Sequence, residues 1–287
     1  MNVTLKIDDA GCIKCGKCVR VCPSKIFSQE AAGKQIEVHN IETCIVCGHC
    51  VAVCPTASVL HSEFPGEKVH PIDRKLLPAP EQIMLLCKAR RSNRAFSSNP
   101  VPPEFLEQIL EAAHRAPTAS NRQNVRFTLI TNPEKLRQVT DFTINVFTSI
   151  AKRLSNPVVK FIVKPIAPEL YAYLTVFKRL MAENAKGNDL ILRNATALIL
   201  IHTPEDSRFG CQDANLAYQN GSLMAESLGV SQFYTGFVCS AIQQDKQEKL
   251  AKLLGIQGKI HAGMALGMPA FRFPNYIDKK DIEVNRL

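Results

Sequence analysis

The chain has 287 residues, of which 46% are hydrophobic and 21% are charged, a composition ordinary for a globular protein. No apolar run approaches the roughly 20 residues that a membrane-spanning helix needs, and the N-terminal residues lack the layout of a secretory signal peptide. We therefore expect a cytoplasmic protein with no membrane partner.

Positive charge is concentrated in the later part of the chain. The formal net charge is +9; residues 1–80 hold nine Lys/Arg and eight Asp/Glu (+1), and the remainder holds 26 and 18 (+8). A basic surface can bind nucleic acid, but no zinc finger, RNP-like aromatic run or basic arm accompanies the charge. We expect no nucleic-acid partner, and the six arginines from Arg90 to Arg126 favour a cofactor that carries a phosphate.

Eight cysteines within the first 54 residues form two copies of one pattern, 32 residues apart. Each copy has the spacing Cys-x2-Cys-x2-Cys-x3-Cys and is followed by proline. This run is the bacterial iron–sulfur signature, in which the fourth cysteine ligates the other cluster. Two copies predict two [4Fe–4S] clusters, one held by Cys12, Cys15, Cys18 and Cys54 and the other by Cys44, Cys47, Cys50 and Cys22.

Zinc and disulfides are the alternatives for so many cysteines. Zinc sites usually combine one CxxC pair with a second, distant pair, whereas here a run of four cysteines occurs twice. A disulfide framework needs an oxidising compartment, which conflicts with the expected location. Residues 1–60 resemble bacterial two-cluster ferredoxins, and we expect them to form a domain of that kind.

Residues 61–82 contain four prolines and show little periodicity. This composition predicts a linker between two domains. An ordered strap packed along the second domain is the alternative, and the sequence does not exclude it. We assign residues 83–287 to the second domain.

The second domain mixes helices and strands without a regular βαβ rhythm. We expect helices over 81–91, from Pro102 onward, and over 133–154, 168–186, 213–228 and 245–254, with strands over 127–131, 196–202, 232–236 and 260–266. This order predicts an α+β fold. No GxGxxG motif opens a helix after a strand, so we do not expect a Rossmann nicotinamide domain.

An arginine-rich segment follows the first of these helices. Residues 90–96 (RRSNRAF) place three guanidinium groups and a hydroxyl within five residues. Arginine binds phosphates and planar acceptors bidentately, which suits a cofactor. A basic cluster after a helix is also favoured simply by the helix dipole, so the segment alone leaves both interpretations open.

A second segment, residues 116–123 (APTASNRQ), lies between a helix and a strand. Together the two segments resemble the nitroreductase family of flavin enzymes, whose pattern is an RRSxR-like start and a later APSxxNxQPW-like loop. Similarity continues in the small-residue helix 213–229, the turn 234–237 (YTGF) and the segment 265–269 (ALGMP). The resemblance covers about residues 83–284, and the full chain is similar to nitroreductase-like proteins with an N-terminal ferredoxin module.

This resemblance implies FMN bound at the interface of a homodimer. It implies that Arg90, Ser92 and Arg94 contact the phosphate and the pyrimidine edge of the flavin, and that Arg91 contributes backbone or charge. It also implies that Lys279 or Lys280 pairs with the phosphate. The second subunit is implied to contribute four residues to the flavin site, namely Pro117, Thr118, Asn121 and Gln123. Thr235 and Gly236 are implied to approach the flavin ring near its reactive N5. No catalytic side chain is expected, because the chemistry takes place at N5 of the flavin.

The implied activity is an oxidoreductase that reduces nitroaromatics, quinones or activated alkenes. Reduced ferredoxin or another redox partner is the implied donor, with NAD(P)H as an alternative. A different class stays open: a module that passes electrons between iron–sulfur partners and a flavin without a substrate of its own. Residues 142–192 match no part of the family pattern, so the sequence does not predict specificity there.

Some side chains outside these motifs have simpler expectations. We expect Cys87, Cys211 and Cys239 to be small buried hydrophobic groups. Four phenylalanines are expected in the core or at a dimer contact, namely Phe142, Phe147, Phe161 and Phe177. His49, inside the second cysteine run, is expected to tune the surroundings of a cluster without ligating it.

Overall fold

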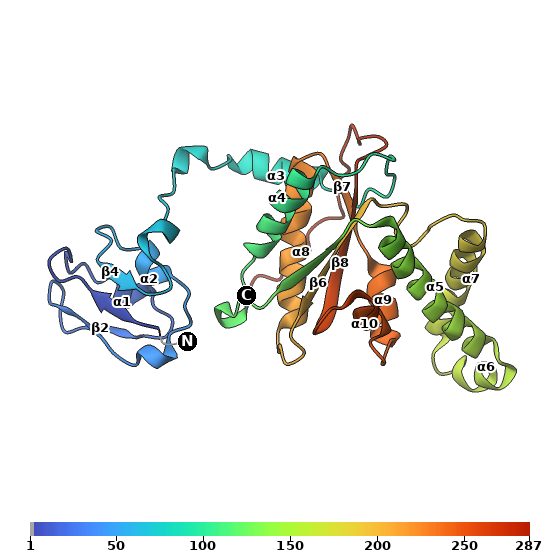
Figure 1. Cartoon of the computed structure of the whole chain (residues 1–287), viewed down its shortest axis with the longest axis horizontal. Helices are drawn as coiled ribbons and strands as arrows, with labels where there is room; N and C mark the ends of the chain where they lie inside the picture. Colours follow the sequence, from blue (N-terminus) through green and yellow to red (C-terminus); the bar gives the residue numbers. More distant parts are fainter. Residues whose placement is uncertain (1–2) are drawn as a thin grey trace. The chain divides into compact units, whose positions relative to one another are not determined.

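The computed structural model describes residues 3–287 (Figure 1). The chain divides into two compact units: the first comprises the described part of 1–78 together with Ala119–Arg122, and the second comprises Ala79–Thr118 and Gln123–Leu287. No helix among the described residues is long and apolar enough to cross a membrane. The cytoplasmic location stays a prediction.

The first unit consists of two halves of similar order, each with a cysteine loop, a short helix and a strand. Its elements are β1 (Leu5–Ile7), α1 (Lys17–Val21), β2 (Phe27–Gln29), β3 (Ile36–Val38), the 3-10 turn η1 (Ile41–Thr43), α2 (His49–Ala52) and β4 (Val59–His61). β1 pairs with β4 and β2 with β3, both antiparallel. A small core forms from Ile26, Phe27 and Val59 together with Cys18 and Cys50.

Glycine explains how each short helix begins. Gly16 precedes α1 with φ 68° and Gly48 precedes α2 with φ 71°, both in the left-handed region that glycine enters without a steric penalty. A Cβ on Gly16 would lie 2.6 Å from Oε1 of Gln29. The glycine after the second cysteine of each CxxCxxC loop therefore leads directly into a helix that carries the third cysteine.

The segment 61–82, predicted as a linker, contains the end of β4, two 3-10 turns and the start of α3. The turns are η2 (Gly66–Lys68) and η3 (Arg74–Leu76), and α3 spans Pro80–Ala89. Asp73 caps η3 by accepting a hydrogen bond from the Lys75 backbone N–H at 3.0 Å.

The second unit is built on a four-stranded antiparallel sheet of order β5-β6-β8-β7. The strands are β5 (Arg126–Ile130), β6 (Ala197–Thr203), β7 (Ser231–Tyr234) and β8 (Lys259–Gly267). Every residue of β6 is buried, so both faces of the sheet are covered. Because side chains alternate along a strand, Leu198 and Leu200 enter one core cluster while Ile199 and Ile201 enter the other.

Helices form the two outer layers of this unit (Figure 1). α4 (Pro103–His114) and α8 (Gly210–Ser227) cover one face, and α5 (Pro133–Ser155), α9 (Gly236–Gln244) and α10 (Lys249–Leu254) cover the other, while α6 (Pro157–Val163) and α7 (Pro168–Ala185) extend from α5. This arrangement confirms the predicted mixture of helices and strands. α8 ends before Gly229, which has φ 71°, as expected for a helix C-cap glycine.

Several local expectations are wrong. Cys87 and Cys211 are exposed and Cys239 is half-buried. α3 buries none of its residues, and Cys211 lies on the exposed side of the first turn of α8. Phe161 on α6 is 85% exposed and lies outside the core of this chain, unlike Phe147, so for Phe161 only the expected dimer contact stays a prediction. The helix α9 was not predicted, since it follows β7 after a single residue and spans only nine residues.

Candidate functional site

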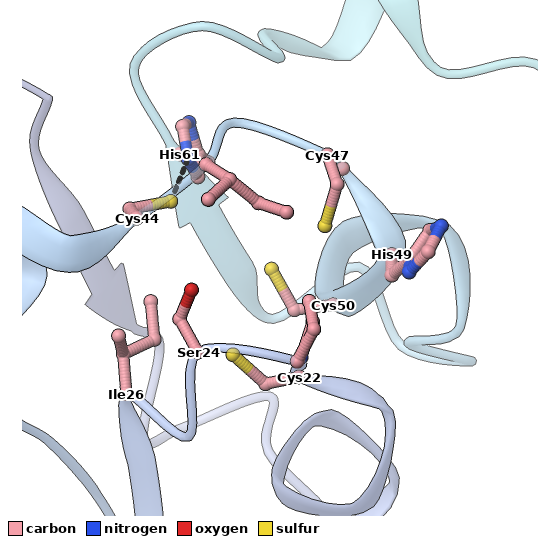
Figure 2. Close-up of a pocket in the computed structure, with 11 residues that line it drawn as sticks. Cys22, Ser24, Ile26, Cys44, Cys47, His49, Cys50 and His61 are labelled. Atoms are coloured by element: carbon pink, nitrogen blue, oxygen red, sulfur yellow. Dashed lines mark hydrogen bonds between the residues drawn. The ribbon is translucent and has the colours of Figure 1, made fainter. Parts of the chain in front are cut away.

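Four cysteines from both runs converge on one small cavity of the first unit (Figure 2). Cys44 follows η1, Cys47 lies in the loop before α2, and Cys50 lies on α2. The fourth is Cys22, which follows the end of α1 in the other half. The structure thus brings together the crossed set of cysteines that the sequence assigned to one cluster.

The remaining four cysteines line a second cavity. Cys12, Cys15 and Cys18 come from the first run, and Cys54 comes from the second. The sulfur of Cys54 accepts a hydrogen bond from the Ser58 backbone N–H at 3.3 Å. Each cavity therefore combines three cysteines of one loop with the last cysteine of the other.

Backbone conformation aims N–H groups at the sulfurs. Lys14 has φ 56° and Val46 has φ 52°, and such left-handed conformations cost energy for residues other than glycine. In return, the Lys14 N–H donates to Sγ of Cys12 and the Val46 N–H donates to Sγ of Cys44, each at 3.4 Å. Donors of this kind stabilise thiolates that bind an inorganic cluster.

The electrostatics of the thiols are consistent with ligation. Burial, reinforced by the charges of neighbouring cysteines, raises the pKa of Cys50 to about 11. Burial also raises the pKa of Cys18. Buried thiols facing one another disfavour ionisation unless a positively charged centre compensates. Four converging cysteines are the donor set of a [4Fe–4S] cluster, so these residues fit that group.

A histidine that the sequence analysis missed lies in the first of these cavities. Nε2 of His61 lies 3.6 Å from Sγ of Cys44, and the ring is buried at 5% exposed (Figure 2). Burial lowers the pKa of His61 from its ordinary value, although the nearby charge of Glu63 opposes this effect. His49, the predicted tuning residue, is exposed and points away from the cysteines.

In the second unit, the arginine segment lies along the start of β7. Ser92 forms a parallel bridge with Gln232, whose Nε2 donates to the Arg91 carbonyl at 3.4 Å. Nδ2 of Asn93 donates to Oγ of Ser231 at 2.8 Å. These bonds fix an extended backbone, in which successive side chains point to opposite sides.

The alternation separates the predicted arginines. Arg94 stacks over the Phe233 ring at 5.4 Å, and the charges of both Arg90 and Arg94 act on the Tyr218 hydroxyl. Arg91 instead stacks over Phe273 at 5.3 Å. The structure therefore places Arg90 and Arg94 on the side of the Tyr218 hydroxyl. The guanidinium of Arg91 instead lies in the cavity that contains Phe273.

A buried polar pair supports the arginine segment and was also missed. The Tyr218 hydroxyl on α8 donates to Oε1 of Gln232 at 2.6 Å, and Gln232 is 1% exposed. Burial raises the pKa of Tyr218 to about 12, despite the opposing charges of the arginines. A glutamine in a short strand next to aromatic residues (SQFY) is the signal that sequence reasoning could have used, because such a group needs a partner when it is buried.

Thr235 and Gly236 lie where β7 passes into α9. Thr235 is buried and its N–H donates to the Gly263 carbonyl at 2.9 Å, which anchors the turn to β8. Gly236 is the exposed first residue of α9, and a Cβ there would meet nothing within 4 Å. The first N–H groups of a helix carry partial positive charge, so a flat acceptor could approach this backbone closely.

The other predicted flavin residues are more dispersed. The Gln123 N–H donates to Oγ1 of Thr118 at 2.9 Å, next to the exposed Pro117. Asn121 belongs to the first unit, where its Nδ2 donates to the Val46 carbonyl at 2.7 Å. The two lysines of the C-terminal segment after β8 are exposed, namely Lys279 and Lys280.

Strain marks the loop that contains these residues. Ser120, Asn121 and Gln123 have φ values of 51°, 52° and 48°, all in the left-handed region. Each such residue costs on the order of 1 kcal/mol and persists only where its surroundings enforce it. A strained loop of this kind is a candidate for binding, as the sequence pattern predicted.

Comparisons with known proteins agree with both units. Residues 87–268, more than half of the chain, match the Nitroreductase family, and residues 4–55 match the 4Fe-4S dicluster domain. A nitroreductase with bound FMN from Bacteroides fragilis is 19% identical, with a TM-score of 0.52 over 71% of this chain and 99% of its own.

Two further solved structures show the same fold. A nitroreductase with bound FMN from Desulfitobacterium hafniense is 19% identical, with a TM-score of 0.53 over 70% of this chain and 97% of its own. An FMN-dependent nitroreductase from Clostridium difficile is 18% identical, with a TM-score of 0.53 over 73% of this chain and 100% of its own. The chain belongs to the nitroreductase family and carries a 4Fe-4S dicluster domain within its first 55 residues.

Proposed function

We propose that this protein is an FMN-dependent oxidoreductase that receives electrons through two [4Fe–4S] clusters. The observation that carries the proposal is the presence, on one chain, of two crossed four-cysteine cavities and a nitroreductase-family unit with an arginine segment. Its substrates are nitroaromatics, quinones or related electrophiles. The domain organisation is 1–60 for the cluster domain, 61–82 for the linker and 83–287 for the flavin domain.

The cysteines of each cavity are the proposed cluster ligands. Cys12, Cys15, Cys18 and Cys54 hold one cluster, and Cys22, Cys44, Cys47 and Cys50 hold the other. When bound, such clusters supply one-electron transfer. The backbone N–H groups of Lys14 and Val46 stabilise the ligating sulfurs of Cys12 and Cys44.

For FMN, the proposed contacts are those that share one side of the arginine segment. Arg90 and Arg94 would bind the phosphate and the pyrimidine edge through charge and hydrogen bonds and Ser92 through a hydrogen bond, while Arg91 supports the segment through its backbone carbonyl. When bound, FMN supplies hydride and single-electron chemistry at N5. The open backbone at Gly236 leaves room for the ring, and buried Thr235 keeps that turn in place.

We propose a homodimer, because α3 leaves apolar side chains exposed in the single chain. It buries no residue, and Ile83 and Met84 are 46% and 57% exposed. A second copy would cover this face and bring in the other predicted flavin residues. These are Pro117, Thr118, Asn121 and Gln123 from the partner loop. Separately, Lys279 or Lys280 would pair with the phosphate.

The proposed donor is reduced ferredoxin or another redox partner that acts through the cluster domain, with NAD(P)H as the alternative. Anaerobically purified protein should contain about eight iron atoms and about one FMN per chain. It should also reduce a nitroaromatic or a quinone with reduced ferredoxin faster than free FMN does. Loss of either cofactor from fully folded protein would contradict the proposal.

The same assay separates this function from a pure electron carrier. Reduction of the bound FMN by ferredoxin without turnover across a panel of nitroaromatics, quinones and activated alkenes would identify a module without its own substrate. Parallel assays with NADH in place of ferredoxin identify the donor. A rate with NADH that equals the ferredoxin rate would show that the clusters are not the entry route.

A further inference from the structure

The two halves of the cluster domain correspond residue by residue at a spacing of 32. Cys12 corresponds to Cys44, and the left-handed residues Lys14 and Val46 occupy matching positions. The last residue of β2 is Gln29 and the last residue of β4 is His61, again 32 apart. A difference between these two end residues is therefore a difference between the two cavities.

Gln29 does not reach a sulfur. Its Nε2 donates to two backbone carbonyls, that of Lys14 at 2.9 Å and that of Lys34 at 2.7 Å. Both amide hydrogens are thereby used within the loop. In this half, the side chain at the end of the strand stabilises the backbone around the cavity and leaves the thiol of Cys12 to the Lys14 N–H.

His61 behaves differently. Its Nδ1 accepts a hydrogen bond from the Glu63 N–H at 3.1 Å, so Nδ1 carries no hydrogen. The neutral ring therefore carries its hydrogen on Nε2, which is the nitrogen that lies 3.6 Å from Sγ of Cys44. The ring is a donor aimed at a proposed cluster ligand, and Figure 2 shows this contact as a dashed line.

The position of the ring is enforced by packing. His61 lies against the ring of Phe64 with centroids 4.9 Å apart. Phe64 in turn covers Gly48, where a Cβ would lie 3.2 Å from the Phe64 ring. Gly48 has the left-handed conformation that starts α2. His61, Phe64 and the cysteine loop therefore form one packed group.

We propose that His61 raises the reduction potential of the cluster held by Cys22, Cys44, Cys47 and Cys50 by donating a hydrogen bond to the Cys44 thiolate. A cluster that accepts an electron becomes more negative, and a hydrogen bond to its sulfur stabilises the reduced form more than the oxidised form. In the other half the matching side chain, Gln29, bonds to carbonyls, whereas the sulfur of Cys54 has the Thr56 hydroxyl at 3.7 Å and the Ser58 N–H at 3.3 Å. The inference rests on the proposed cluster ligation.

His61→Phe removes the donor and keeps a planar ring, and His61→Gln introduces the residue of the other half. The matched control is His49→Gln, because His49 lines the same cavity but is exposed and points away from the sulfurs. The full-length anaerobic protein is titrated with dithionite at one fixed pH, and the two cluster signals are followed by electron paramagnetic resonance. Each cluster accepts one electron from the titrant.

The wild-type protein should show two separate cluster potentials. In His61→Phe the potential of the cluster next to Cys44 should fall, whereas the other potential should stay in place. His49→Gln should leave both unchanged. Two unchanged potentials in a His61→Phe protein that retains its iron would overturn the proposal.

A second measurement needs no variant and therefore no assumption about folding. Wild-type protein labelled with ¹⁵N-histidine and reduced with excess dithionite should show a magnetic coupling between a histidine nitrogen and a reduced cluster. Absence of that coupling would also overturn the proposal. Protein that contains no iron would instead contradict the proposed function, so the two failures are distinguishable.

Discussion

The two units hold their proposed cofactors by different means. In the first unit, cysteines between residues 12 and 54 bind directly, and the backbone N–H groups of the same loops support them. In the second unit, the arginine segment depends on residues more than 100 positions away, since Tyr218 and Gln232 fix it from α8 and β7. Replacement of a single cysteine should therefore remove a whole cluster. Replacement of a single residue around the flavin should only weaken FMN binding.

The largest expected effect is the loss of one cluster from Cys22→Ser. Because Cys22 lines the cavity of the second cysteine run, the cluster of that cavity should be lost while the other is retained. Iron and sulfide should fall to about half, from roughly eight to roughly four iron atoms per chain. Cys87→Ser is the matched control, since Cys87 is exposed and outside both cavities. Loss confined to the cluster of the first run would contradict the crossed ligation.

Arg90→Gln should weaken FMN binding without affecting the iron content. A hydrogen bond to a charged group contributes about 1.5–3 kcal/mol, so the Kd for FMN should rise about 10- to 150-fold by fluorescence titration. Arg115→Gln is the control, because Arg115 is exposed and pairs only with Glu111 on its own helix. Equal FMN affinity in Arg90→Gln and wild type would remove Arg90 from the proposed site.

Tyr218→Phe tests whether α8 supports the arginine segment at a distance. The change leaves Oε1 of the buried Gln232 without its 2.6 Å donor, and an unpaired buried acceptor costs about 1–3 kcal/mol. The unfolding free energy of the second unit should fall by about this amount, and the Kd for FMN should rise severalfold. Tyr173→Phe, at an exposed tyrosine of α7, should change neither quantity. An unaffected Kd would show that the segment does not need this support.

The smallest expected effect is a loss of stability at acidic pH in the second unit. Burial lowers the pKa of His202 and of His261, and nearby cations (Arg126 and Lys259 respectively) lower them further. Between the lowered folded pKa and the unfolded value of about 6.5, the unfolded chain binds more protons. Stability should be constant above that value and should fall as the pH decreases through this window. Urea unfolding at pH 7.5 and 5.5, followed by FMN release, measures it.

His202→Gln is the variant that checks this assignment. It removes one of the two histidines, and therefore the dependence on pH should become shallower. Thr128 lies 3.1 Å from Nε2 of His202, and glutamine can keep a hydrogen bond to its hydroxyl. An unchanged pH dependence would assign the loss of stability to other groups.

The contrast between the units also explains what the sequence could predict. The cysteine runs predicted which residues would meet, because cluster ligands have a fixed spacing in the sequence. The main helices and strands follow from periodicity and their order predicted the α+β fold, while the family resemblance assigned the arginine segment to FMN. Tyr218, Gln232 and His61 were missed. Each acts through a side-chain contact with a residue elsewhere in the sequence, and no motif fixes the spacing between the two partners. The burial of Cys87 was predicted wrongly, since a helix that buries nothing cannot be distinguished by sequence from one that packs.

The most direct test of the account is a reductive titration of the anaerobic wild-type protein with limiting dithionite. Two clusters accept one electron each and FMN accepts two, so the protein should take up about four electrons per chain. The absorbance of both the brown and the yellow chromophores should bleach in the course of that titration. An uptake of about two electrons or fewer by folded protein would contradict the claim that one polypeptide joins two iron–sulfur clusters to a flavin.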